Sequence, residues 1–203
     1  MGGDEASGFE RFAILTMGRS PKQSRGLMRR LVYHCASSID GFVALENGTF
    51  DCFAMEGPHV DDFIAKFSDY DTALMGRRTY EVGLAAGVTN PYPTMKTYVF
   101  SRTMKHSPHE AVTIVSENAE QLVRELKGQE GKDLWLVGAG DLASTLLAAG
   151  LIDEVCIKLN PIVMAKGIPV VARTEAPLSL DLVETKTYDN GVVLLTYGLS
   201  ASP

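Results

Sequence analysis

Positive charge, cysteine and long apolar runs are all scarce in this chain of 203 residues. The 19 lysines and arginines are outnumbered by 25 aspartates and glutamates, which gives a formal net charge of −6. No basic face offsets this charge, so nucleic acid is not expected as a main partner. No segment approaches the roughly 18 apolar residues of a membrane-spanning helix, so no membrane partner is expected either.

The cysteines exclude two further classes of protein. Cys35, Cys52 and Cys156 are far apart and odd in number, which suits reduced thiols in a cytoplasmic protein better than a disulfide framework. The zinc deaminase signature, His-x-Glu followed by Pro-Cys-x-x-Cys, is absent. We therefore expect a cytoplasmic protein without a metal site.

The first 27 residues differ in composition from the rest. They hold five glycines and scattered charges, and their one apolar run is too short for the core of a secretion signal. We expect residues 1–27 to be a poorly ordered N-terminal extension. The remaining residues, 28–203, are enough for one well-buried domain.

The chain is organised around residues 132–150, KDLWLVGAGDLASTLLAAG. A short apolar run at 134–137 has the pattern of a buried strand, and Gly138-Ala139-Gly140 leads at once into apolar residues at helical spacing. Free N–H groups and the helix dipole at such a junction favour a phosphate. The alternative, a tight strand-to-helix turn with no ligand, is about equally compatible with this stretch alone.

The rest of the chain alternates short strands with amphipathic helices. Strands are expected at 31–36, 42–44, 72–75, 96–101, 111–115, 134–137 and 154–159. Helices are expected from Pro58, from Gly76, from 117 to 127 with Ser116 as the cap, and over 142–147. Asn190-Gly191 predicts a closing hairpin between 183–188 and 192–197. This alternation predicts an α/β fold with a mostly parallel sheet and helices on both faces.

Three of these strands end in small or basic residues, in segments 74–81, 98–103 and 134–142. In an open parallel sheet, ligands gather at the carboxyl ends of the strands. The three ends would supply Arg77, Arg78 and Arg102 together with the hydroxyls of Thr79 and Ser101. A dinucleotide with an extra ribose phosphate needs this supply of donors and positive charge.

These motifs resemble a known family, the dihydrofolate reductase-like fold and within it the C-terminal reductase domain of the bifunctional riboflavin-biosynthesis deaminase–reductase. The resemblance covers about residues 29–198. It rests on the segments SSIDGFVA (37–44), MGRRTYE (75–81), VFSR (99–102), LVGAGDLASTLL (136–147) and IDEVCIKLNPIV (152–163). It implies a stand-alone NADPH-dependent reductase with a central, mostly parallel eight-stranded sheet flanked by helices and closed by the C-terminal hairpin. It also implies a homodimer and a small heterocyclic substrate.

The resemblance implies roles for individual residues as well. Arg77 and Arg102, with Ser101, would hold the 2′-phosphate, while Arg78 and Thr79 after Gly76 would meet the pyrophosphate. Ala36 and Val43 would lie at the nicotinamide. The segment that wraps the pyrophosphate and the nicotinamide half of NADPH would comprise Gly138, Ala139, Gly140 and Leu142.

Two carboxylates are candidates for the proton chemistry that accompanies hydride transfer. In folate reductases the acid lies on the helix after the first strand, where this chain has Asp61 and Asp62. At about 100° per residue, Asp61 is about 110° from the centre of the apolar stripe 60–67 and Asp62 about 150°, so Asp61 is expected nearer the interior. The alternative is that both acids serve only the helix dipole. Asp40 is the second candidate, although in Ser-x-Asp-Gly it also suits a turn.

Two other functions remain open from the sequence. One is a dinucleotide-binding module without turnover, acting as a sensor or dimeric scaffold, and the other is a pterin or folate reductase. The stretches 45–58 and 83–95, which would contact the substrate, match no motif. The specificity of the predicted reductase is therefore left open.

Overall fold

The computed structural model describes residues 28–199. The predicted N-terminal extension, 1–27, lies outside the described residues. Eight strands form one sheet in the order β5-β4-β3-β6-β1-β7-β10-β9. Strands β1, β3, β4, β5, β6 and β7 are parallel to their neighbours in this set, and β10 and β9 run antiparallel. The predicted mostly parallel sheet with a closing hairpin is therefore confirmed.

The strands and helices follow the expected order. The strands are β1 (Leu31–Ser37), β2 (Phe42–Ala44), β3 (Tyr70–Gly76), β4 (Lys96–Phe100), β5 (Val112–Val115), β6 (Asp133–Val137), β7 (Glu154–Leu159), β8 (Ile168–Pro169), β9 (Leu180–Thr187) and β10 (Val193–Leu199). The helices are α2 (Pro58–Ala65), which continues as the 3-10 turn η1 (Lys66–Asp69), α3 (Arg77–Ala85), α4 (Ala119–Lys127) and α5 (Asp141–Ala148). No helix in the described ranges is long and apolar enough to cross a membrane.

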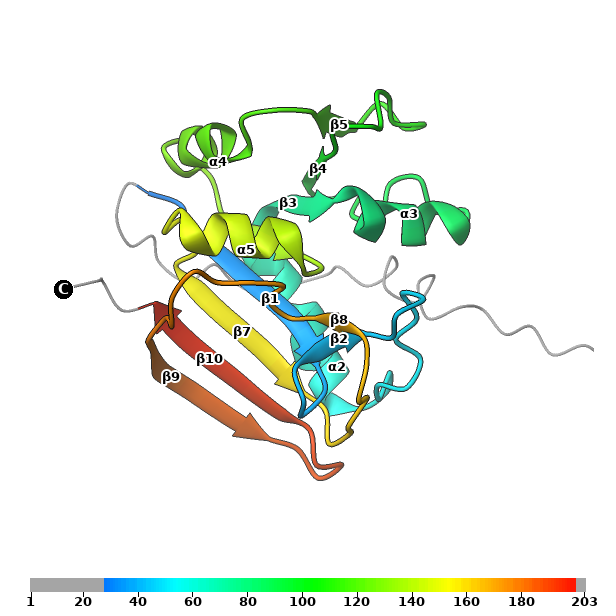
Figure 1. Cartoon of the computed structure of the whole chain (residues 1–203), viewed down its shortest axis with the longest axis vertical. Coiled ribbons are helices and arrows are strands. Elements are labelled where there is room, and N and C mark those ends of the chain that lie inside the picture. Colours follow the sequence, from blue (N-terminus) through cyan, green and yellow to red (C-terminus); the bar gives the residue numbers. More distant parts are fainter. Residues whose placement is uncertain (1–27, 200–203) are drawn as a thin grey trace, which may run out of the picture.

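Helices cover both faces of the sheet, and a separate apolar core lies on each. Helices α4 and α5 lie in front of the sheet in Figure 1, and their Val123, Leu126 and Leu146 pack on the β1 and β6 side chains of that face. On the other face, Phe63 of α2 and Tyr80 of α3 pack with Trp135. The central parallel strands β1, β3 and β6 are largely buried on both sides, which explains why apolar residues follow one another in their sequences.

The predicted start of α4 was wrong, and one short strand was missed. Helix α4 begins at Ala119 rather than at Glu117, and its N-cap is Asn118 in the left-handed conformation with φ 57°, not Ser116. The carbonyl of Asn118 accepts the first helical hydrogen bond, from Leu122 N, so the two residues before it extend the loop. The strand β8 was not predicted, because a two-residue strand pairing with β2 carries no periodicity.

Candidate functional site

The three predicted strand ends lie side by side. Strand β3 pairs in parallel with β4 on one side and β6 on the other, with Gly76 opposite Phe100 and Met75 opposite Val137. Parallel neighbours end at the same edge of the sheet, so the segments that follow all three strands emerge together. This edge is where an open α/β sheet binds its ligands.

The sheet also divides at this edge. Strand β1 pairs with β6 only from Leu31 to Tyr33 and then continues to Ser37 with β7 as its sole described partner. The carboxyl half of β1 is thus separated from β6, which stays paired with β3 up to Val137. A division between neighbouring parallel strands gives a flat group room to enter between them.

One glycine fixes the contact between the ends of β3 and β6. Gly138 has φ 84°, and a Cβ built on it would lie 2.2 Å from Thr79 Oγ1. The Thr79 side chain therefore occupies the space that any other residue at 138 would need, and it holds the start of α3 against the turn after β6. The Gly138-Ala139 peptide is trans, since no peptide bond of the described residues is cis.

Two other glycines at this edge face open space. A Cβ built on Gly76 or on Gly140 would meet no atom of residues 28–199 within 4 Å. Gly76 is the N-cap of α3 and Gly140 the N-cap of α5, and neither helix start has a side-chain hydrogen bond to cap it. No side chain of residues 28–199 competes with an anion for the first N–H groups of either helix, and the helix dipoles favour an anion there.

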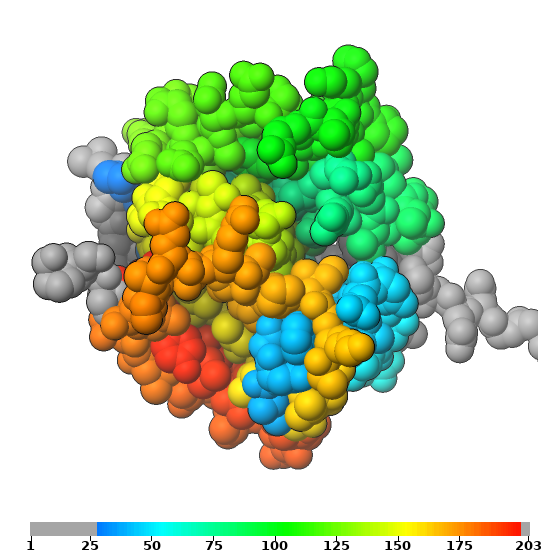
Figure 2. All heavy atoms as spheres, in the orientation of Figure 1, coloured from blue at the N-terminus to red at the C-terminus, as the bar shows by residue number. Residues whose placement is uncertain are grey.

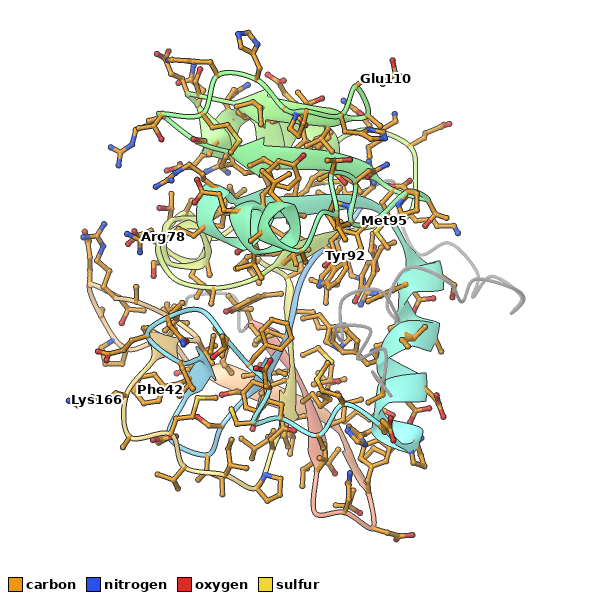
Figure 3. The ribbon with its side chains drawn as sticks, turned by 90° about the vertical axis from the view of Figure 1, so that its right-hand side faces the viewer. Phe42, Arg78, Tyr92, Met95, Glu110 and Lys166 are labelled. Atoms are coloured by element: carbon orange, nitrogen blue, oxygen red, sulfur yellow. The ribbon has the colours of Figure 1, made fainter. Side chains whose placement is uncertain are left out.

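The arginines of this region differ in their ion pairs and in their exposure to solvent. Arg77 Nη1 donates to Glu81 Oε1 at 2.6 Å along the half-exposed side of α3, whereas Arg78 and Arg102 are exposed. Figure 3 shows Arg78 projecting outward above Phe42 and Lys166. Figure 2 shows the surface indented between α3, α5 and the segment around β8.

Ser101 is buried and shapes the loop after β4. Its Oγ accepts hydrogen bonds from the backbone N–H groups of Thr103 and Met104, at 3.2 and 2.8 Å. The hydroxyl proton is still available for donation, because these contacts use only its acceptor capacity. Ser101 thus sets the direction of the exposed Arg102.

The segment after β8 lies across the first turn of α5. Val171 forms a bridge with Gly140, and Ser144 Oγ accepts the backbone N–H groups of Ala172 and Arg173 at 3.1 and 3.2 Å. Arg173 comes within 3.9 Å of the exposed Asp141. Sequence reasoning missed Arg173, which brings a further positive charge to this helix start.

The expected order of the two helix acids was wrong. Asp61 is exposed, and Asp62 is half-buried; its Oδ2 accepts a hydrogen bond from Tyr188 Oη at 2.6 Å and pairs with Lys186. Residue Phe67, which helped to define the apolar stripe, belongs to the 3-10 turn η1 rather than to α2. Without it the buried side of α2 is centred on His59, Val60 and Phe63, and this rotation moves Asp62 inward.

Asp40 links the turn after β1 to the loop before β8 by hydrogen bonds. Its carboxylate accepts the backbone N–H groups of Met164 and Ala165 at 3.0 and 2.7 Å. The hydrogen bond from Ser38 and the bond from Met164 lower the pKa of this exposed carboxyl. A carboxylate held ionised in this way favours the turn-forming role for Asp40 over that of a proton donor.

The histidines next to the proposed cleft are both buried. His59 has both ring nitrogens within hydrogen-bond distance of a partner, Ala54 O at 3.0 Å and Asn190 Nδ2 at 3.2 Å, so it is a structural residue that links α2 to the hairpin. His34 on β1 contacts the Phe63 ring, with centroids 4.2 Å apart. The two proposed nicotinamide contacts, Ala36 and Val43, are half-buried.

The arrangement fits a nicotinamide dinucleotide. Open glycines stand at two uncapped helix starts, exposed guanidinium groups flank them, and a division in the sheet lies beside Ala36. No group of three or more histidine, cysteine, aspartate or glutamate side chains that could hold a metal ion is found among residues 28–199.

One similar sequence and one similar structure each match most of the chain. The uncharacterized protein YyaP of Bacillus subtilis is 30% identical over 181 residues, covering 83% of this chain and 94% of its own. A protein from Shewanella sp. PV-4 named for riboflavin biosynthesis superposes with a TM-score of 0.73 at 25% identity, covering 86% of this chain and all of that one.

Two more distant structures show the fold alone. The deaminase/5-amino-6-(5-phosphoribosylamino)uracil reductase of Thermotoga maritima gives a TM-score of 0.66 at 15% identity over 85% of this chain, which spans 57% of that protein. Dihydrofolate reductase of Enterococcus faecalis, in complex with NADP(H), gives 0.63 at 16% identity and covers 85% of this chain and 97% of its own. The family profile described as the RibD C-terminal domain matches residues 29–194. The chain therefore belongs to the RibD C-terminal domain family and has the dihydrofolate reductase-like fold.

Proposed function

We propose that this protein is an NADPH-dependent reductase that transfers hydride to a small heterocycle, of the kind reduced by 5-amino-6-(5-phosphoribosylamino)uracil reductase. The observation that carries the proposal is the set of open positions beside Gly76 and Gly140, at two uncapped helix starts on adjacent strand ends. A pyrophosphate placed there would receive N–H donors from both helices. The family membership supports the same activity.

In this proposal each part of the edge binds one part of the cofactor. The start of α3, with Gly76, Arg78 and Thr79, meets the pyrophosphate from one side. The opposite side and the nicotinamide half are covered by the residues of the β6–α5 junction, namely Gly138, Ala139, Gly140 and Leu142. Arg102 and Arg77, with Ser101 donating its hydroxyl proton, hold the 2′-phosphate.

The nicotinamide ring is proposed to enter between β1 and β6, next to Ala36 and Val43. The bound cofactor supplies the hydride, and the protein supplies placement and exclusion of water. Phe63 and Trp135, whose ring centroids are 6.1 Å apart, form an apolar wall on the α2 side of this division. Asp61 stays a candidate acid only as an exposed residue at the mouth of the cleft.

The cofactor proposal is tested by titrating NADPH and NADH against single arginine variants. Arg102→Ala should weaken NADPH binding about 10- to 100-fold, as expected for the loss of a charge-assisted hydrogen bond of about 1.5–3 kcal/mol, and should leave NADH binding unchanged. Arg77→Ala should have a smaller effect, because Glu81 already pairs with Arg77.

Arg124→Ala is the matched control, since Arg124 is an exposed arginine on α4 away from the strand ends. It should bind both cofactors as the wild type does. Equal NADPH affinity in the wild type and Arg102→Ala would contradict the 2′-phosphate assignment. Oxidation of NADPH that depends on a pyrimidine substrate separates a reductase from a binding module without turnover.

We propose a homodimer because the edge strand of the sheet, β9, is exposed. Strand β9 is exposed along its whole length, and it carries the apolar side chains of Leu180, Leu182 and Val183 outside the core. An exposed edge strand of this kind readily pairs with a second copy. Sedimentation should therefore show a dimer that Val183→Lys dissociates.

The three cysteines are free thiols, which agrees with the proposed cytoplasmic location.

A further inference from the structure

The segment after β8, residues 170–173, runs beside α5 (Figure 1) and is held at its first residue by two hydrogen bonds. Val170 N donates to Gly41 O at 2.9 Å, and Val170 O accepts the hydroxyl of Tyr33 at 2.6 Å. Tyr33 is fully buried, so its hydroxyl is a fixed donor rather than a mobile surface group. The segment therefore starts from a set position beside the turn after β1.

Ser144 of α5 holds the other end of this segment. Ser144 is buried, and its Oγ donates to Gly140 O at 3.0 Å while accepting the backbone N–H groups of Ala172 and Arg173. The hydroxyl proton and both lone pairs of Ser144 are thus in use. Because Ala172 and Arg173 are tied to the first turn of α5, the exposed guanidinium of Arg173 stays close to the start of that helix.

Arg173 faces a carboxylate at this helix start. Arg173 Nη2 is 3.9 Å from Asp141 Oδ1, and 80% and 81% of the two side chains are exposed. An ion pair between side chains as exposed as these contributes little to folding stability. Asp141 is the first residue of α5, beside N–H groups that no side-chain hydrogen bond caps. The charge of Asp141 therefore matters most to what binds at the helix start.

The carboxylate of Asp141 and an anionic ligand would compete for this helix start. The dipole of α5 and its first N–H groups favour negative charge, but a carboxylate next to Gly140 repels a phosphate group that approaches them. Charges within one helical turn lie inside the Debye length of about 8 Å at physiological ionic strength, so salt screens this repulsion only in part. A cation fixed beside Asp141 removes most of it.

We propose that Arg173 neutralises Asp141 and thereby allows the start of α5 to accept the pyrophosphate of NADPH, and that Ser144 positions Arg173 for this role. This inference rests on the proposed reductase function, because it takes the start of α5 as the pyrophosphate site. Arg173 acts through Asp141 and not by contact with the cofactor. Its effect on binding therefore depends on the presence of the carboxylate.

A double-mutant cycle separates this role from a direct contact between Arg173 and the cofactor. In NADPH titrations, Arg173→Ala should bind about 3- to 10-fold more weakly than the wild type, as expected for repulsion between unit charges in a solvent-exposed site. Asp141→Asn should bind at least as tightly as the wild type. In the Asp141→Asn background, Arg173→Ala should have no further effect, because no carboxylate is left to neutralise.

Salt dependence gives a second readout. The ratio of NADPH affinities between the wild type and Arg173→Ala should approach one at about 1 M salt, where the Debye length falls to about 3 Å. A loss of binding caused by distortion of the segment 170–173 would persist at this salt concentration. Ser144→Ala releases the two N–H groups that fix Arg173, so it should also weaken NADPH binding, and this effect should disappear in the Asp141→Asn background.

Arg124 and Glu120 on α4 are the matched control pair, since their charged atoms are also 3.9 Å apart. Arg124→Ala and Glu120→Gln should leave NADPH binding unchanged, both alone and together. The role of Arg173 would be overturned if the effect of Arg173→Ala persisted in the Asp141→Asn background. Equal NADPH affinity in the wild type and Arg173→Ala would overturn it as well.

The start of α5 can also be probed without NADPH, which separates the two proposals. Inorganic pyrophosphate added to the wild type should shift the amide resonances of Leu142 and Ala143, the second and third residues of α5. These shifts should be smaller in Arg173→Ala and return when Asp141→Asn is added. If the wild type shows them but does not bind NADPH, the reductase proposal fails and the role of Arg173 stands. No shifts in the wild type, or equal shifts in Arg173→Ala, would overturn that role.

Discussion

At the scale of the residue, three glycines in one region are expected to behave differently. Gly138→Ala should destabilise the protein by about 2 kcal/mol or more, because its backbone has φ 84° and the new Cβ would overlap Thr79 Oγ1. Gly76→Ala should leave stability nearly unchanged, since φ there is −77° and the space beside it is open. It should nevertheless weaken NADPH binding, because the methyl group would occupy the space proposed for the pyrophosphate.

Urea unfolding and NADPH titration of the two variants check these expectations together. Gly140→Ala gives the intermediate case, with a strained φ of 83° but no clash. It should cost about 1–3 kcal/mol from the backbone alone, because a residue with a Cβ rarely adopts this conformation. The site assignment would be wrong if Gly76→Ala bound NADPH as tightly as the wild type.

At the scale of the element, Asp40 connects the turn after β1 to the loop before β8. Asp40→Asn keeps the size of the side chain but leaves only one carbonyl oxygen for the two N–H groups of Met164 and Ala165. Hydrogen exchange at these two amides should therefore accelerate about tenfold, while the amides of β1 and β7 stay protected. Turnover should change little. A loss of turnover as large as that of an active-site acid, with exchange unchanged, would instead support the catalytic role.

The elements themselves were largely predictable, because each parallel strand is a short apolar run with its own turn signal. The order of the strands along the chain followed from these runs, and the meeting of three strand ends followed from the rule that such ends share an edge; the order of the strands within the sheet was not predicted. Which side of α2 faces the core was not predictable, since nothing in the sequence shows that the helix ends and a 3-10 turn begins before Phe67.

The burial of Lys158 could not be predicted from the sequence either. Lys158 stands in the run VCIKLN, where alternation alone would allow it to face solvent. Its burial depends on α2, nearly a hundred residues earlier in the chain, covering that face. Contacts between segments this distant are set by tertiary packing, which local patterns do not specify.

At the scale of the whole molecule, stability should fall in mild acid because of His34. Burial first, and then the positive charges of Lys66 and Lys158, lower the pKa of His34 from its usual 6.5 to about 3. Between these two pH values the unfolded chain binds a proton that the folded protein does not. The free energy of unfolding contributed by this group is therefore complete above about pH 6.5, falls by about 1.4 kcal/mol per pH unit below it, and levels off below about pH 3.

The prediction is checked by urea unfolding of the wild type and of His34→Gln at about pH 7 and about pH 4.5. Glutamine keeps a polar side chain at this position but does not titrate, so the stability difference between the two pH values should be smaller in the variant by about 2 kcal/mol or more. The carboxylates titrate equally in both proteins, and their contribution cancels in this comparison. Parallel loss of stability in the two proteins would show that His34 takes up its proton in the folded state. In that case the face between β1, β7 and α2 would be wetter than its burial indicates.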